Sequence, residues 1–149
     1  MAKKRVLIVC TGNACRSQMA EALWRAEAGD EYEVASAGTH PAGVHPLARQ
    51  VIEELGIDMS SHRSKSVYSF ADESFDMVVT VCNSAREICP TFPRAKRLLH
   101  WPFPDPISAV GDLDERLAEF RGIRDIIRAK IRDFVASERF QVAPPVPTC

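Results

Sequence analysis

The chain has 149 residues, enough for one compact domain and too few for two of ordinary size. Its 46% hydrophobic and 26% charged residues are ordinary for a soluble globular protein, and a net charge of −1 argues against nucleic acid or an anionic membrane as the main partner. The basic N-terminus precedes an apolar run, Val6 to Val9, that is shorter than the roughly 7 to 15 residues of a secretion signal. We therefore expect a monomeric, cytoplasmic protein without a membrane-spanning segment.

Apolar patterns predict strands that alternate with helices along the chain. Residues 4–10 form a continuous apolar run, which is typical of a strand buried on both faces. Residues 57–74 are expected to contain only a helical turn or two, and the three prolines in residues 101–106 exclude helix and strand there. Further strands are predicted at residues 32–37, 75–81 and 96–99, and helices, from apolar side chains at helical spacing, at residues 17–28, 44–55 and 113–134.

This alternation predicts an α/β fold, a single-domain three-layer sandwich around a four-stranded parallel sheet. The domain is expected to span residues 1–140, followed by a proline-rich C-terminal tail at residues 141–149. Parallel sheets of this kind bind ligands at the carboxyl ends of their strands. Cys10 and Cys82 both stand where a predicted strand ends, so we expect two thiols at the same edge of the sheet.

Cys10 opens a loop of small, turn-prone residues that leads into the next predicted helix. In such a strand–loop–helix segment, backbone N–H groups converge in the loop and the helix dipole adds positive potential, so the loop can bind an oxyanion. The same field favours the thiolate form of Cys10 over the thiol. Arg16 can bind an oxyanion through two parallel hydrogen bonds. The expected oxyanion-binding residues are Thr11, Gly12, Asn13, Ala14, Cys15, Arg16 and Ser17.

The five cysteines are an odd number in a chain that otherwise looks intracellular, which disfavours a structural disulfide framework. No CxxC or HxxxH spacing occurs, so zinc is disfavoured as well. A helix between Cys82 and Cys89 would hold their sulfurs on one face, about 10.5 Å apart along its axis. A disulfide needs Cα atoms within roughly 7 Å, so a bridge requires this short helix to unwind. Alternatively, both cysteines are small apolar side chains packed beneath the loop.

The string CTGNACRSQMAE, residues 10–21, resembles thioredoxin-coupled arsenate reductases of the low-molecular-weight protein tyrosine phosphatase family. The plain phosphatases usually carry proline after the Arg-Ser pair, where this chain has Gln18, and they lack a cysteine pair with the spacing of Cys82 and Cys89. The resemblance extends from residue 5 to about residue 136. It implies a low-molecular-weight tyrosine phosphatase-like fold and an oxidoreductase that reduces arsenate to arsenite, a detoxification reaction that confers arsenic resistance.

The resemblance also implies a mechanism without a cofactor. The Cys10 thiolate attacks arsenic while Arg16 neutralises the oxyanion, and Asp105 protonates the departing hydroxyl as a general acid. Cys82 then attacks Cys10 and expels arsenite, Cys89 attacks Cys82, and thioredoxin reduces the resulting disulfide. From the sequence alone, Asp105 could equally be a solvated loop carboxylate.

Other residues have roles that the resemblance suggests or leaves open. Some family members bind potassium with residues aligned with Asn13, Glu21, Ser36 and an acidic side chain, but the fourth position here corresponds to Lys65. Its ammonium group could pair with Glu21 in place of the ion, so we expect no metal. Ser17 is expected to donate a hydrogen bond to Cys10, to cap the following helix, or both. We interpret Cys15 as a spare buried thiol in preference to an accessory redox thiol, and Cys149 as incidental.

Two rival functions are weighed against arsenate reduction. The first is a low-molecular-weight protein tyrosine phosphatase in which Cys82 and Cys89 only regulate activity through their redox state. The second is a catalytically silent module that binds oxyanions. The simultaneous presence of Cys10, Arg16 and Asp105 argues against the silent module.

Overall fold

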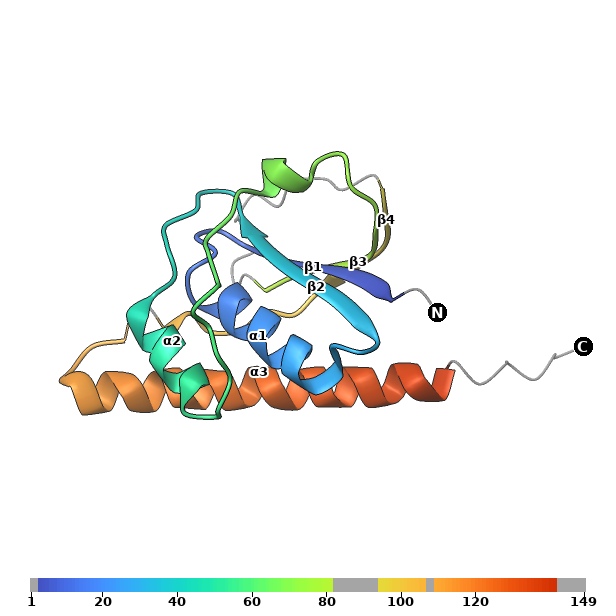
Figure 1. Cartoon of the computed structure of the whole chain (residues 1–149). Coiled ribbons are helices and arrows are strands. Elements are labelled where there is room, and N and C mark those ends of the chain that lie inside the picture. The colour runs from blue at the N-terminus through green and yellow to red at the C-terminus, as the bar shows by residue number, and fades with distance from the viewer. Residues whose placement is uncertain (1–2, 82–93, 107–108, 142–149) are drawn as a thin grey trace, which may run out of the picture.

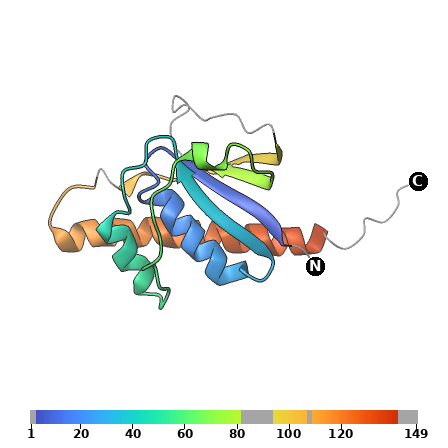
Figure 2. The same ribbon diagram turned by 45° about the horizontal axis from the view of Figure 1, so that its top comes forward.

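The computed structural model describes residues 3–81, 94–106 and 109–141, and in these ranges four parallel strands form one sheet (Figures 1 and 2). The strand order is β2-β1-β3-β4, so β1 and β3 are the central strands. The predicted α/β class and four-stranded parallel sheet are therefore confirmed. The elements are β1 (Lys4–Cys10), α1 (Arg16–Ala28), β2 (Tyr32–Gly38), α2 (Pro46–Glu53), the 3₁₀ helix η1 (Val67–Phe70), β3 (Phe75–Thr80), β4 (Ala95–His100) and α3 (Leu113–Gln141).

The central strand β1 is buried from Val6 to Cys10 because both faces of the sheet are covered. Val6, Ile8 and Cys10 belong to the large core that β1 forms with the three α-helices. Leu7 and Val9 face the other way, into a smaller core that includes residues of η1. Figure 1 shows η1 and the α-helices on opposite sides of the sheet. Covering layers on both faces explain the unbroken apolar run.

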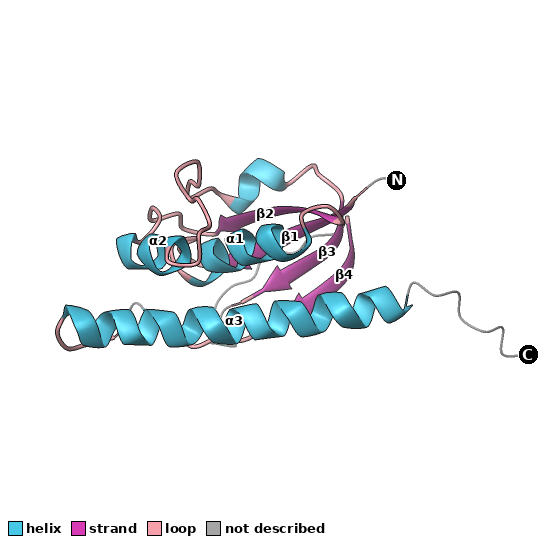
Figure 3. Ribbon diagram, turned by 60° about the horizontal axis from the view of Figure 1, so that its bottom comes forward, coloured by secondary structure: helices cyan, strands magenta, loops and turns pink. Residues whose placement is uncertain are grey.

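Helix α3 runs along one side of the molecule and packs against α1 and α2 (Figure 3). Its buried stripe, which includes Phe120, Ile127 and Ile131, has the spacing that predicted the helix. The helix nevertheless continues seven residues beyond its predicted end at residue 134. In that extension Glu138 accepts a hydrogen bond from Arg97 of β4, an interaction between segments distant in sequence.

Helix α2 is shorter than the predicted range of residues 44–55. It begins at Pro46, where His45 caps it by accepting a hydrogen bond from the backbone N–H of Leu47 at 3.1 Å. It ends at Glu53, and Gly56 then turns the chain with a φ of +79°, a conformation that glycine adopts at little cost. Val44 and Leu55, the apolar residues that extended the prediction, pack on the core from outside the helix.

An aromatic cluster anchors the segment at residues 101–106. The rings of Trp24 and Trp101 stack with their centroids 5.6 Å apart, and Phe134 of α3 meets both edge-on. Trp101 and Phe103 continue the line of β4 by donating their backbone N–H groups to Thr80 and Val81. This segment is neither helix nor strand apart from a single 3₁₀ residue, Pro106, as its prolines predicted.

Within the described ranges, no helix is both long and apolar enough to cross a membrane. The division into a domain at residues 1–140 and a tail at residues 141–149, the monomeric state and the cytoplasmic location all stay predictions.

Candidate active site

The loop between β1 and α1 is held in place by hydrogen bonds that its backbone carbonyls accept from a neighbouring segment of the chain. The segment at residues 39–45 donates backbone N–H groups to four of these carbonyls at 2.8–3.3 Å. Gly38, the last residue of β2 and the one before that segment, has no room for a side chain, because a Cβ there would lie 2.5 Å from the carbonyl oxygen of Thr11. The four carbonyls are those of Cys10, Thr11, Gly12 and Ala14.

Asn13 determines the shape of the loop. Its φ of +47° lies in the left-handed region, which few residues other than glycine adopt easily and which asparagine tolerates. In this conformation its backbone N–H points at Cys10 Sγ, 3.2 Å away. The side chain is fully buried and donates from Nδ2 to Ser17 Oγ at 2.8 Å and to Ser36 Oγ at 2.9 Å.

These contacts determine the direction of the hydrogen bond between Ser17 and Cys10, whose Oγ and Sγ atoms lie 2.8 Å apart. The backbone N–H of Lys65 donates to Asn13 Oδ1 at 2.8 Å, so the amide of Asn13 must present its NH₂ group to Ser17. Ser17 Oγ accepts that bond, which leaves its hydroxyl proton to point at the sulfur. Two donors therefore meet Cys10 Sγ, and both stabilise a thiolate.

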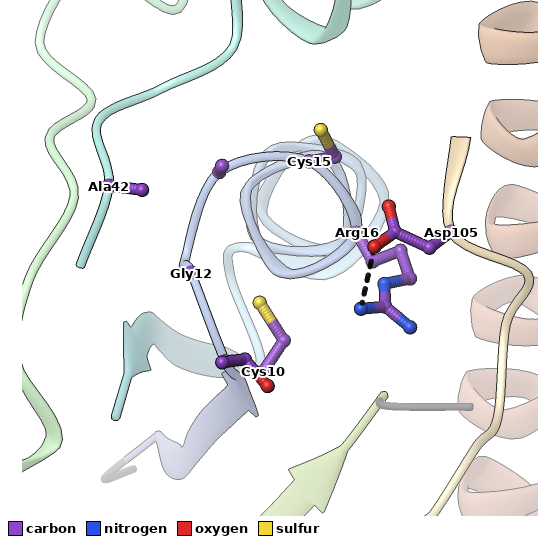
Figure 4. A pocket seen from close by; sticks show the side chains of 8 residues that line it. Cys10, Gly12, Cys15, Arg16, Ala42 and Asp105 are labelled. Carbon is purple, nitrogen blue, oxygen red and sulfur yellow. Dashed lines mark hydrogen bonds and ion pairs between the residues drawn. The ribbon is translucent and has the colours of Figure 1, made fainter. Parts of the chain in front are cut away.

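Arg16 joins the loop to the ends of two other segments. Its guanidinium is buried and donates from Nη1 to the carbonyl of Phe103 at 3.2 Å and to that of Val81 at 3.4 Å. From Nη2 it pairs with Asp105 Oδ2 at 3.3 Å (Figure 4). Asp105 is one-third exposed, so its carboxylate can reach both the arginine and solvent.

Cys10, Arg16 and Asp105 line one cavity of about 360 Å³ (Figure 4). Cys15 also faces it, but burial raises the pKa of the Cys15 thiol to about 12, and the nearby Asp105 charge adds to this effect, so the thiol stays protonated at neutral pH. This agrees with the interpretation of Cys15 as a spare buried thiol. The complete lining among the described residues is Cys10, Thr11, Gly12, Ala14, Cys15, Arg16, Ala42 and Asp105.

The polar layer behind the loop does not fit a potassium ion. Glu21 is buried, and its Oε1 accepts a hydrogen bond from Ser36 at 2.6 Å and lies 3.6 Å from Lys65 Nζ. Its other oxygen pairs with Arg25 at 3.1 Å. The carboxylate thus already faces two cationic groups, one of them the lysine that was expected to replace the ion. In the described part of the chain, no group of three or more acidic, histidine or cysteine side chains could hold a metal.

The structure places some predicted site residues and not others. Asp105 and the loop residues other than Asn13 and Ser17 line one cavity. Asn13 and Ser17 do not line it, but both contact the Cys10 sulfur. Cys82, Cys89 and Cys149 lie outside the described residues. Val81, the residue before Cys82, donates its backbone N–H to Val9 and accepts a hydrogen bond from Arg16 with its carbonyl. The chain that leaves β3 therefore contacts the site at Val81.

Sequence reasoning noticed Gln18 only as a departure from the proline of the phosphatases and missed Ser64 altogether. Gln18 is fully buried and hydrogen-bonds to Asn13. Ser64 Oγ lies within hydrogen-bond distance of the carbonyls of both Gly12 and Asn13, at 3.0 and 3.1 Å. The one signal in the sequence was that glutamine stands where the phosphatases have proline, because a proline cannot donate the hydrogen bonds that the glutamine amide makes here.

A parallel sheet that ends in a cysteine–arginine oxyanion loop defines a known class of protein. Residues 5–142 match the family model of low molecular weight phosphotyrosine protein phosphatase, and the chain belongs to this family. Within the family it is similar to an arsenate reductase of Halalkalibacterium halodurans, with 42% identity over 134 residues that cover 90% of this chain and 96% of that protein.

Solved structures give the same likeness. An arsenate reductase in the phosphate-binding state superposes with a TM-score of 0.77 at 29% identity, covering 90% of this chain and 98% of that one. A thioredoxin-dependent arsenate reductase of Corynebacterium glutamicum superposes with a TM-score of 0.72 at 28% identity, covering 93% of this chain and 63% of that longer one. The family resemblance and the fold expected from the sequence are confirmed.

Proposed function

We propose that this chain reduces arsenate to arsenite with electrons supplied by thioredoxin. The Cys10 thiolate forms a bond to arsenic, and a hydroxyl leaves as water after Asp105 protonates it. A Cys82 thiolate then attacks the Cys10 sulfur. The sulfur–arsenic bond breaks, its electron pair stays on arsenic, and arsenite leaves in the trivalent state. Cys89 displaces Cys10 from Cys82, and the dithiol of thioredoxin reduces the Cys82–Cys89 disulfide by exchange.

The observation that carries this proposal is that a cysteine sulfur contacted by two hydrogen-bond donors and a buried arginine line the same cavity. Ser17 and Asn13 both donate to Cys10 Sγ, and Arg16 lies on the same cavity wall. A tetrahedral oxyanion in the cavity therefore meets a nucleophile, a cation and the loop that leads into the N-terminus of α1. The similarity to arsenate reductases supports arsenate as that oxyanion.

The composition of the cavity wall favours a compact inorganic substrate over an aryl phosphate. Among the described residues, the lining contains no aromatic side chain, and Ala42 and Ala14 are the apolar groups beside the loop. The ring of a phosphotyrosine would find no stacking partner on that wall. Weak hydrolysis of a reactive phosphate ester remains compatible with the same thiolate and general acid.

A coupled assay tests the proposal. Arsenate, thioredoxin, thioredoxin reductase and NADPH are supplied, and NADPH loss is followed beside p-nitrophenyl phosphate hydrolysis. Cys82→Ser is expected to abolish arsenate turnover and retain phosphatase activity, whereas Cys10→Ser loses both. Cys149→Ser is the matched control and is expected to behave as the parent.

Each other result has a definite meaning. Arsenate turnover by Cys82→Ser at the parental rate would refute the thiol relay. Hydrolysis of the ester by the parent without any arsenate reduction would favour the phosphatase function. Phosphate binding with neither activity would leave an oxyanion-binding module.

A further inference from the structure

The buried amide of Gln18 occupies a position that no step of the proposed reaction uses. Gln18 lies in the first turn of α1, is fully buried, and faces three carbonyl-type oxygens with its Nε2 atom. These are Arg63 O at 2.8 Å, Asn13 Oδ1 at 3.0 Å and Asn13 O at 3.2 Å. Backbone carbonyls can only accept hydrogen bonds, so the atom that faces them must be the NH₂ nitrogen, and the orientation of the amide is determined.

The other end of the amide is equally constrained. Gln18 Oε1 lies 3.0 Å from His62 Nδ1, and because that oxygen can only accept, His62 carries its proton on Nδ1. The opposite ring nitrogen lies 3.5 Å from Arg25 Nη1, which can only donate. Burial, together with the charges of Arg25 and Lys65, lowers the pKa of His62 against the opposing effect of Glu21, and this agrees with a neutral ring.

We infer that Gln18 is a positioning residue that fixes Asn13, and through Asn13 the hydrogen bonds that hold Cys10 as a nucleophile; this inference rests on the proposed function of the same site. The bonds run in one direction, from His62 to Gln18, from Gln18 to Asn13 Oδ1, from Asn13 Nδ2 to Ser17, and from Ser17 to Cys10 Sγ. Their direction follows from the two amide orientations: backbone carbonyls determine that of Gln18, and the backbone N–H of Lys65 determines that of Asn13.

Gln18 is one of several supports of Asn13, which sets the size of the expected effect. Lys65 N also donates to Asn13 Oδ1, and Ser64 Oγ also reaches the Asn13 carbonyl. Removing the Gln18 donors therefore leaves the loop folded but less firmly held in the left-handed conformation of Asn13. An uncompensated polar contact of this kind changes binding by about tenfold.

Two variants of nearly unchanged shape test the inference. Gln18→Met retains the length of the side chain without any amide, and Gln18→Glu replaces the NH₂ donor by an oxygen that faces three other oxygens. Gln50→Met, at an exposed position on α2, is the matched control. Inorganic phosphate binding is measured by calorimetry, and the pH midpoint of Cys10 alkylation by iodoacetamide is measured by peptide mass spectrometry.

We expect both Gln18 variants to bind phosphate about tenfold more weakly and to shift the alkylation midpoint to higher pH, while Gln50→Met does neither. A purely structural role would lower the melting temperature and leave both readouts of the folded protein unchanged, which would overturn the inference. Because neither readout requires arsenate or thioredoxin, a parent that fails to reduce arsenate would refute the proposed function without affecting this test.

A measurement on the unaltered protein covers the case in which the variants do not fold. The ¹⁵N chemical shifts of His62 are expected to show a neutral ring protonated on Nδ1, with its signals assigned by their loss in His62→Gln. A ring protonated on Nε2 alone could not donate to Gln18 and would contradict the orientation of the Gln18 amide, and with it the bond from Gln18 to Asn13 on which the inference depends.

Discussion

The carboxylate of Asp105 pairs with the same guanidinium that an incoming oxyanion needs. The pair is 3.3 Å long, and Arg16 is almost fully buried while Asp105 is one-third exposed. An oxyanion that binds Arg16 must compete with this carboxylate, whereas a general acid must be protonated when it acts. Asp105 is therefore expected to weaken the binding of the substrate and to speed its conversion.

Asp105→Asn separates these two effects. The variant should bind inorganic phosphate more tightly, because Arg16 loses a competing negative charge, and should reduce arsenate about 100-fold more slowly, because the acid is missing. Calorimetry and the NADPH-coupled assay measure the two quantities. Asp114→Asn, an exposed carboxylate on α3, is the control. Weaker phosphate binding by Asp105→Asn would contradict the competition.

At the scale of single elements, α3 supplies the wall against which α1 and the aromatic cluster pack. Ile127 is fully buried in that wall, and its neighbour Ile126 is 51% exposed on the same helix. The two positions carry the same residue type in the same helix, so they separate the effect of core packing from the effect of helix propensity.

Ile127→Ala is expected to lower the free energy of unfolding by about 3 kcal/mol, since it removes buried methylene groups and leaves a cavity. Ile126→Ala should lower it by less than about 1 kcal/mol. Urea unfolding monitored by circular dichroism provides both values. Equal losses for the two variants would show that α3 does not pack as described.

An element could be predicted from the sequence when the interactions that form it join residues close together along the chain. β1 and the loop after it were predictable because the apolar run and the small residues are local signals. The last turns of α3 were not, because Glu138 depends on Arg97 of β4, which lies 41 residues away. Gln18 and Ser64 were missed for the same reason, since their partners at the site become neighbours only when the chain has folded.

At the scale of the whole molecule, the site is assembled from segments spread along most of the chain. The loop at residues 10–17 is supported by the segments at residues 38–45 and 62–65, and Arg16 binds the carbonyls of Val81 and Phe103. An oxyanion that binds only this assembled arrangement has no affinity for the unfolded chain. Its binding therefore stabilises the entire fold.

Inorganic phosphate at about 100 times its dissociation constant should raise the free energy of unfolding by about 2.7 kcal/mol. Calorimetric melting with and without phosphate measures the effect as an increase in Tm. Arg16→Gln should lose most of this increase, because the cation that binds the oxyanion is gone. An increase of the same size in that variant would mean that phosphate binds elsewhere on the protein.

The stacked pair of Trp24 and Trp101 contains both tryptophans of the chain. One indole is fixed within α1, and the other begins the segment that carries Asp105. A displacement of that segment alters the overlap of the two rings, and with it their ultraviolet emission. The protein thus contains its own optical reporter of Asp105, which stopped-flow fluorescence can read in real time without a dye.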